Sequence, residues 1–212
     1  MDKLAKTCAR VCYYTYHPDQ ATDIGEWRAH SKSDRIVVYI NKITFAVIIG
    51  VRGSKDMDDI KTDVRLLAGS QTISDTQPYL RLKSVLATGT IPIDSKIVLT
   101  GHSLGGLVCL YEFLQFRLKN IVKCIVFNPY IPPNSGIISM LQNLPTNRRA
   151  MLGIYATKED TASIYIRDVR GINITYMPFK NRKIRGLASV LGTGLGVKIA
   201  EIAEAHSIRN FI

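Results

Sequence analysis

The sequence predicts an α/β fold with a mostly parallel central sheet, and two observations support this prediction. Strand-like apolar runs recur from residue 96 onward, with helical pieces between the first three, at residues 96–100, 121–127, 151–155 and 172–176. Strands that alternate with helices pair in parallel. The second observation is the segment Gly-His-Ser-Leu-Gly-Gly at 101–106, which follows one of these strands and precedes the helix-like run 107–114.

The first third of the chain predicts a helix and an antiparallel hairpin. Apolar side chains recur at helical spacing over residues 3–16, before His-Pro-Asp interrupts the pattern. Two runs rich in β-branched residues, 35–40 and 43–51, are joined by Asn41-Lys42 and indicate a hairpin. The segment 56–67 has helical spacing and an acidic start, which suits the positive end of a helix dipole.

The remaining segments complete the layout. Residues 69–78 are polar and predict a loop, and 79–88 predict a helix. Residues 188–205 are apolar and rich in small residues, with helix-like spacing over 197–205. We expect helices on both faces of the sheet and one domain over residues 1–212, because a chain of this length buries a large share of its surface in a single core.

Composition and targeting signals favour an intracellular protein. No apolar run reaches the roughly 18 residues of a membrane span, and the first residues lack the apolar core of a secretory signal. Cys8 and Cys12 lie four apart on one face of a predicted helix, while Cys109 and Cys124 fall in apolar runs, which favours a reducing compartment. We therefore expect a cytoplasmic or virion-associated protein without disulfides, and the cysteine spacing predicts no metal site.

The charge predicts an anionic partner. The formal net charge is +11, and part of the excess lies in the cluster 180–185. Phospholipid surfaces, nucleic acid and acidic proteins all attract such a surface, and a solvated basic loop is an equally good interpretation of the cluster. We predict no specific nucleic-acid binding, since basic residues do not alternate regularly with aromatic ones.

Ser103 is the predicted nucleophile. It lies between Gly101 and Gly105, two residues away on each side, at a strand-to-helix turn. Glycines there leave room for a sharp turn that exposes the serine hydroxyl at the tip of the strand. A hydroxyl becomes a good nucleophile when an imidazole accepts its proton and a carboxylate orients that imidazole.

Chain order selects the partners of this serine. In hydrolases with this turn the order is Ser, then Asp or Glu, then His, and His206 is the histidine that follows Ser103. Asp160 follows a predicted strand and would arrive at its carboxyl end, where α/β sheets gather functional groups. Glu159 is the second choice for the acid and Asp168 the third.

Two groups are predicted to bind the oxyanion of a tetrahedral intermediate. The backbone N–H of Leu104 follows the nucleophile directly, and Ser54 lies in an Arg-Gly-Ser loop after the long strand of the hairpin. Ser54 offers both a backbone N–H and a hydroxyl. An alternative role for Ser54, capping of the helix that begins near residue 56, does not exclude the first.

These motifs resemble the class 3 (fungal-type) lipases of the α/β-hydrolase superfamily. The resemblance covers residues 35–206 and consists of Val-Arg-Gly-Ser at 51–54, an acidic helix at 56–63, the Gly-His-Ser-Leu-Gly-Gly segment, a strand that ends in Asn128-Pro129, and the late His206. It implies an α/β-hydrolase fold with a Ser103, Asp160 and His206 triad, a Ser54 and Leu104 oxyanion hole, and no cofactor or metal.

The expected function is hydrolysis of a carboxylic ester in a lipid, as in a lipase or phospholipase, with peripheral contact to an anionic membrane surface. Acyl transfer to an acceptor other than water would use the same residues. A second hypothesis, favoured by the charge, is a catalytically silent hydrolase-fold protein that serves as a binding or structural component of a larger assembly or virion.

Overall fold

The computed structural model describes most of the chain: residues 1–54, 62, 65–66, 68–89, 91–115, 117–133, 135–158, 169, 171–178 and 206–212. The helices and 3-10 turns are α1 (Lys3–Tyr16), η1 (Pro18–Gln20), η2 (Ile73–Asp75), α3 (Gln77–Ala87), α4 (Leu104–Leu114), α5 (Ile137–Gln142), α6 (Thr146–Arg149) and η4 (Ile208–Phe211). The strands are β1 (Trp27–Lys32), β2 (Ile36–Asn41), β3 (Val47–Val51), β4 (Ile97–His102), β5 (Ile121–Phe127), β6 (Leu152–Thr157) and β7 (Ile174–Met177).

One sheet of seven strands organises the structure, and its strands lie side by side in chain order. β1, β2 and β3 pair antiparallel, whereas β3 to β7 pair in parallel. Val51 is paired with Gly101, and His102 with Phe127, so the carboxyl ends of the parallel strands meet at one edge. Functional groups of α/β folds gather at that edge.

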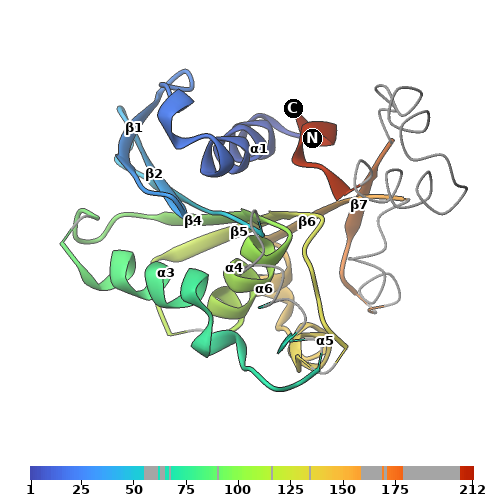
Figure 1. Cartoon of the computed structure of the whole chain (residues 1–212). Coiled ribbons are helices and arrows are strands. Elements are labelled where there is room, and N and C mark those ends of the chain that lie inside the picture. Colours follow the sequence, from blue (N-terminus) through green and yellow to red (C-terminus); the bar gives the residue numbers. More distant parts are fainter. Residues whose placement is uncertain are drawn as a thin grey trace, which may run out of the picture.

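The helices cover both faces of the sheet, and the strand order explains their distribution. Every parallel step from β3 to β7 goes in the same direction, and right-handed crossovers then place the described connecting helices on one face. α3, α4, α5 and α6 lie on that face, whereas α1 and the C-terminal turn η4 lie on the other (Figure 1). Each face has its own apolar core.

α1 lies close to the sheet because a glycine stands beneath it. A β-carbon added at Gly50 of β3 would lie 2.6 Å from Val11 Cγ1 and 3.1 Å from Thr15 Cγ2, both on α1. The Cys12 thiol is 3.3 Å from the Thr100 hydroxyl of β4. The side chain of Asp2 caps the helix by accepting from the N–H of Ala5. These contacts fix α1, including its last residue Tyr16, relative to the ends of β3 and β4.

The predicted fold class is confirmed: the sheet is mostly parallel, the hairpin is antiparallel, and helices cover both faces. Two details differ from the prediction. The second strand of the hairpin begins at Val47 and not at residue 43, because Asn41 Oδ1 accepts from the N–H groups of Ile43 and Thr44 and builds a longer turn. The additional edge strand β1 was not predicted.

Several predicted segments fall wholly or mainly outside the described residues. Of the predicted helix at 56–67, residues 62, 65 and 66 are described and are helical. The segment 188–205 and the basic cluster 180–185 lie outside them. All four cysteines are free and buried. Within the described part of the chain, no helix is both long enough and apolar enough to cross a membrane.

Candidate active site

Ser103 occupies a sharp turn between the end of β4 and the start of α4. Its backbone has φ 56° and ψ −126°, a region that is strained for a residue with a side chain. Three backbone hydrogen bonds hold this conformation: Ser103 N–H donates to the carbonyl of Phe127 at 3.2 Å, and the Ser103 carbonyl accepts from Leu107 and Tyr130 at 3.1 Å each. The surrounding structure therefore enforces the sharp turn that the sequence predicts.

The two flanking glycines are required because backbone approaches them. A β-carbon at Gly101 would collide with the carbonyl group of Gly105, and one at Gly105 would collide with the carbonyl oxygen of Val51. Backbone atoms in a strand and a helix cannot move aside as a flexible side chain would. The glycines of the Gly-x-Ser-x-Gly segment are therefore required by the close contacts of β4 with α4 and of α4 with β3.

The Ser103 hydroxyl is not used to hold the fold. The side chain is 8 % exposed, does not cap α4, and makes no hydrogen bond to any described residue. Leu104 is the first residue of α4, so its N–H has no acceptor within the helix and points out of the helix N-terminus. The hydroxyl and this N–H are therefore adjacent and available to a ligand.

The Arg-Gly-Ser loop after β3 lies against the nucleophile. A β-carbon at Gly53 would lie 2.9 Å from Ser103 Cβ and 2.5 Å from the Tyr16 hydroxyl, so glycine permits the loop to touch both. Ser54, the next residue, is half-buried. It lines a cavity of about 390 Å³ whose walls include Tyr13, Tyr16, His102, His206 and Ile208. Ser103 itself does not line this cavity.

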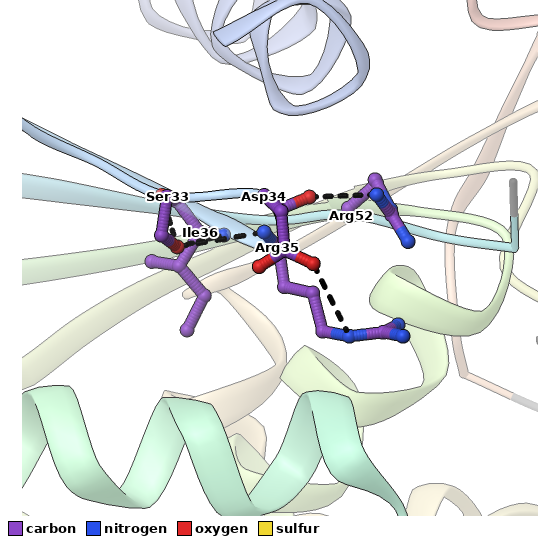
Figure 2. A network of polar contacts seen from close by, with 5 residues as sticks. All are labelled: Ser33, Asp34, Arg35, Ile36 and Arg52. Atoms are coloured by element: carbon purple, nitrogen blue, oxygen red, sulfur yellow. Dashed lines mark hydrogen bonds and ion pairs between the residues drawn. The ribbon is translucent and has the colours of Figure 1, made fainter.

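Arg52 anchors that loop, a role that the sequence did not reveal. Its guanidinium is buried and donates to the carbonyl of Asp34 at 2.8 Å, while its N–H donates to the carbonyl of Arg35 at 2.8 Å. The Ser33 hydroxyl closes the turn between β1 and β2 by accepting from the N–H of Ile36 at 3.0 Å. Figure 2 shows this network, which ties the start of the loop to the antiparallel edge of the sheet.

His102 uses both nitrogens of its buried ring. Nε2 is 2.5 Å from the backbone carbonyl oxygen of His206, and Nδ1 is 2.9 Å from the hydroxyl of Tyr16. A carbonyl oxygen only accepts, so Nε2 carries the hydrogen. In the neutral ring Nδ1 then accepts from the Tyr16 hydroxyl. These bonds join residues that are 104 and 86 positions apart in the chain.

His206 lies beside the residue that precedes the nucleophile. Its half-buried ring is 4.9 Å from that of His102, centroid to centroid, and it shares the cavity with Ser54. No hydrogen bond between the Ser103 hydroxyl and the His206 imidazole is found among the described residues. The structure therefore brings His206 and Ser54 into one cavity, with Ser103 immediately behind its wall.

The acid candidates Asp160, Glu159 and Asp168 lie outside the described residues. The strand that leads toward Asp160 is well defined. Asn128, at φ 40°, follows β5, and its Oδ1 accepts from the N–H of Thr157 at 2.9 Å. Its own N–H donates to the carbonyl of Tyr155 at 2.8 Å. The fully buried Asn128 thus fixes the end of β6 three residues before Asp160.

The described residues contain no group of three or more His, Cys, Asp and Glu side chains that could hold a metal ion. The arrangement instead offers a strained serine, a helix N-terminal amide, a glycine-serine loop and a histidine at one edge of the sheet. Such a set suits nucleophilic attack on a carbonyl carbon with stabilisation of the resulting oxyanion.

Comparison with known proteins found similarity to solved structures only. No family model matches the chain, and no curated protein matches it by sequence. Among solved structures, a triacylglycerol lipase from Penicillium expansum is similar with a TM-score of 0.47 and 12 % identity. The similarity covers 84 % of this chain and 79 % of the lipase.

Proposed function

We propose that this protein is a serine hydrolase that cleaves carboxylic esters of lipids. The observation that carries the proposal is Ser103, a non-glycine residue held at φ 56° between a strand and a helix, with a hydroxyl that serves no structural purpose. Strained backbone of this kind persists where the surrounding structure over-determines it, and such positions cluster at active sites. Gly101 and Gly105, each two residues from the serine, and the N-terminus of α4 directly after it support the same function.

In the proposed reaction Ser103 Oγ attacks the ester carbonyl carbon and His206 accepts the hydroxyl proton. The carbonyl oxygen becomes an oxyanion, which accepts hydrogen bonds from the Leu104 N–H and from Ser54. Collapse breaks the bond to the alcohol, which leaves with the proton from His206. Water then attacks the acyl carbon while His206 accepts its proton, and collapse breaks the bond to Ser103 Oγ, which takes that proton back from His206 as the acid leaves. Asp160 orients His206 throughout.

The His206 ring must come within hydrogen-bond reach of Ser103 in this reaction. Catalytic hydrogen bonds are often long in a protein without substrate and tighten in the complex. The position of His206 supports the assignment, because its ring lies 4.9 Å from that of His102, the residue that directly precedes Ser103. The neighbouring Ser54 in the same cavity supports its role at the oxyanion.

Two features favour a lipid as the substrate: the positive net charge of the chain and the apolar side chains that line the cavity beside Ser103. Anionic lipid surfaces attract a chain with a net charge of +11. Tyr13, Tyr16 and Ile208 supply apolar surface to the cavity beside the site. Phospholipid esters therefore suit the site better than small polar esters.

The test compares Ser103→Ala with wild type. We expect the variant to lose at least about 1,000-fold in hydrolysis of a p-nitrophenyl ester and to lose labelling by a fluorophosphonate probe. Ser84→Ala, which removes an exposed hydroxyl on α3, is the matched control and keeps both. Fatty-acid release from anionic phospholipid, zwitterionic phospholipid, monoacylglycerol and triacylglycerol then ranks the substrates. A wild-type protein that neither turns over esters nor reacts with the probe would leave the silent scaffold as the better account.

A further inference from the structure

The side chain of His102 lies on the α1 face of the sheet, apart from the nucleophile that follows it. It is 5 % exposed and packs between Tyr16 and His206, with ring centroids 5.8 Å and 4.9 Å away. Its Nε2–H donates to the backbone carbonyl of His206, and its Nδ1 accepts from Tyr16. The two ring nitrogens of His102 therefore connect the end of β4 to two other elements: Nδ1 binds α1 through Tyr16, and Nε2 binds the C-terminal segment through His206.

We propose that His102 and Tyr16 form a clamp that positions the imidazole of His206 for the reaction at Ser103. This inference rests on the proposed function and adds two positioning residues to it. Neither side chain is placed at the reacting atoms. The clamp acts on the backbone of His206, and the side chain of His206 then extends from a fixed point into the cavity that holds Ser54.

Both ends of the clamp are rigid, which is what positioning requires. Tyr16 ends α1, which sits on Gly50 and is further tied to β4 by the contact of Cys12 with Thr100. His102 ends β4 and is paired with Phe127 in the sheet. A catalytic group must be held within a fraction of an ångström of its productive place, and groups on helices and strands meet that requirement better than groups on loops.

The C-terminal segment has a second attachment a few residues beyond His206. Phe211 packs on Phe127 with ring centroids 5.1 Å apart, and Ile208 is buried in the same apolar core as α1. That attachment holds η4 on the sheet. The hydrogen bond from His102 adds a contact at the backbone of His206 itself.

Tyr16 also selects the tautomer of His102. Nδ1 accepts a hydrogen bond as long as the Tyr16 hydroxyl faces it, and the hydrogen of the neutral ring then stays on Nε2. Without the hydroxyl the ring is free to carry its hydrogen on Nδ1. In that tautomer Nε2 has no hydrogen and faces the His206 carbonyl oxygen as a second acceptor, so the clamp opens.

The experiment uses the full chain and four variants. His102→Leu removes the donor, whereas His102→Gln keeps an amide N–H at about the place of Nε2. Tyr16→Phe removes the hydroxyl that sets the tautomer. The matched control is Tyr14→Phe, which deletes a hydroxyl from the same helix whose partner is Thr22, at 3.3 Å.

We expect His102→Leu and Tyr16→Phe to lower kcat for a p-nitrophenyl ester by about 10- to 100-fold with KM changed less than about threefold. His102→Gln should recover most of the lost kcat, and Tyr14→Phe should match wild type. A general loss of stability would not be repaired by glutamine in this way. Equal kcat values in His102→Leu, His102→Gln and wild type would overturn the proposal.

The rate of hydrogen exchange of the backbone amides at 207–212 tests the clamp independently of enzymatic activity. We expect exchange there to be faster by about tenfold or more in His102→Leu and Tyr16→Phe, and unchanged in His102→Gln and Tyr14→Phe. An inactive wild type with this exchange pattern would refute the proposed hydrolase and leave the clamp standing. Unchanged exchange in every variant would refute the clamp, whatever the activity.

Discussion

Two polar clusters, each built around a buried side chain, lie on opposite faces of the sheet and differ in the polar groups that border them. The histidine cluster consists of Tyr16, His102 and His206 on the α1 face, at the carboxyl ends of the strands. The glutamate cluster consists of Tyr79, Lys83 and Glu112, in the layer formed by α3 and α4. The first borders a cavity and a strained serine, whereas the second is enclosed among helices.

The glutamate cluster is internally satisfied. Glu112 is 1 % exposed, and its two carboxylate oxygens accept from the Tyr79 hydroxyl and the Lys83 ammonium group, each at 3.0 Å. Burial, together with the negative charge of Glu112, raises the pKa of Tyr79 to about 12. Both carboxylate oxygens of Glu112 are bound to side chains of α3, so this cluster holds α3 against α4 and offers no unbonded carboxylate oxygen to a ligand.

In this protein a buried charge is by itself a poor guide to function. Glu112 is a deeply buried acid, yet it lies inside a helix and away from the strand ends. Ser103 carries no charge, but its backbone is strained and its hydroxyl is uncommitted. Position at the carboxyl edge of the sheet and an unused hydroxyl therefore identify the candidate site more clearly than ionisation does.

We expect the largest loss of stability from a substitution in the Ser103 turn, next to the histidine cluster. Gly105→Ala places a methyl group against the backbone of β3, and we expect it to lower the free energy of unfolding by about 3 kcal/mol or more. Gly89→Ala is the control, because no atom lies within 4 Å of an added β-carbon there. Urea unfolding followed by circular dichroism gives both values. A Gly105 variant as stable as wild type would show that the turn can relax.

Glu112→Ala tests whether the glutamate cluster acts independently of the histidine cluster. It removes the carboxylate that accepts two hydrogen bonds, one of them part of an ion pair with Lys83, and we expect the free energy of unfolding to fall by about 2–3 kcal/mol. Reaction of Ser103 with a fluorophosphonate, expressed per folded molecule, should not change. Glu26→Ala, at an exposed site, is the control for loss of an acidic side chain. A specific loss of probe reactivity in Glu112→Ala would mean that the clusters are coupled.

The smallest expected effect is on the dependence of stability on alkaline pH. Burial raises the pKa of the Cys12 thiol and of Tyr79, each to about 12, so the folded protein keeps protons that the unfolded chain releases at about 8.5 and 10. The stability that these groups contribute is complete at neutral pH and is lost as pH rises from about 8.5 toward 12.

Tyr79→Phe tests the tyrosine part of this dependence. We expect the decline between pH 8.5 and 10 to persist, because buried thiols cause it, and the decline above pH 10 to become shallower by at most about 1.4 kcal/mol per pH unit. The measurement is the urea midpoint at a series of pH values. An unaltered slope above pH 10 would show that Tyr79 does not contribute to the alkaline loss.

Local sequence patterns predicted the parts of the fold that depend on local chemistry. The apolar spacing of residues 3–16 predicted α1, and the strand-like runs predicted β2 to β7. β1 escaped prediction because it is a polar edge strand whose side chains alternate between half-buried and exposed, so it carries no continuous apolar signal. The hairpin turn was misjudged because the side chain of Asn41 lengthens it.

The strand, the glycine-flanked Ser103 and the helix after it could be predicted from neighbouring residues alone, because only glycine fits where backbone segments touch. Tertiary structure alone decided the roles of Tyr16, Arg52, His102 and Asn128. Their hydrogen-bond partners lie between 17 and 104 residues away, from Arg35 for Arg52 at a separation of 17 to His206 for His102 at 104, with Thr157 for Asn128 at 29. A hydrogen bond between distant segments leaves no local period or spacing, and so it becomes visible only when the sheet brings the ends of its strands together.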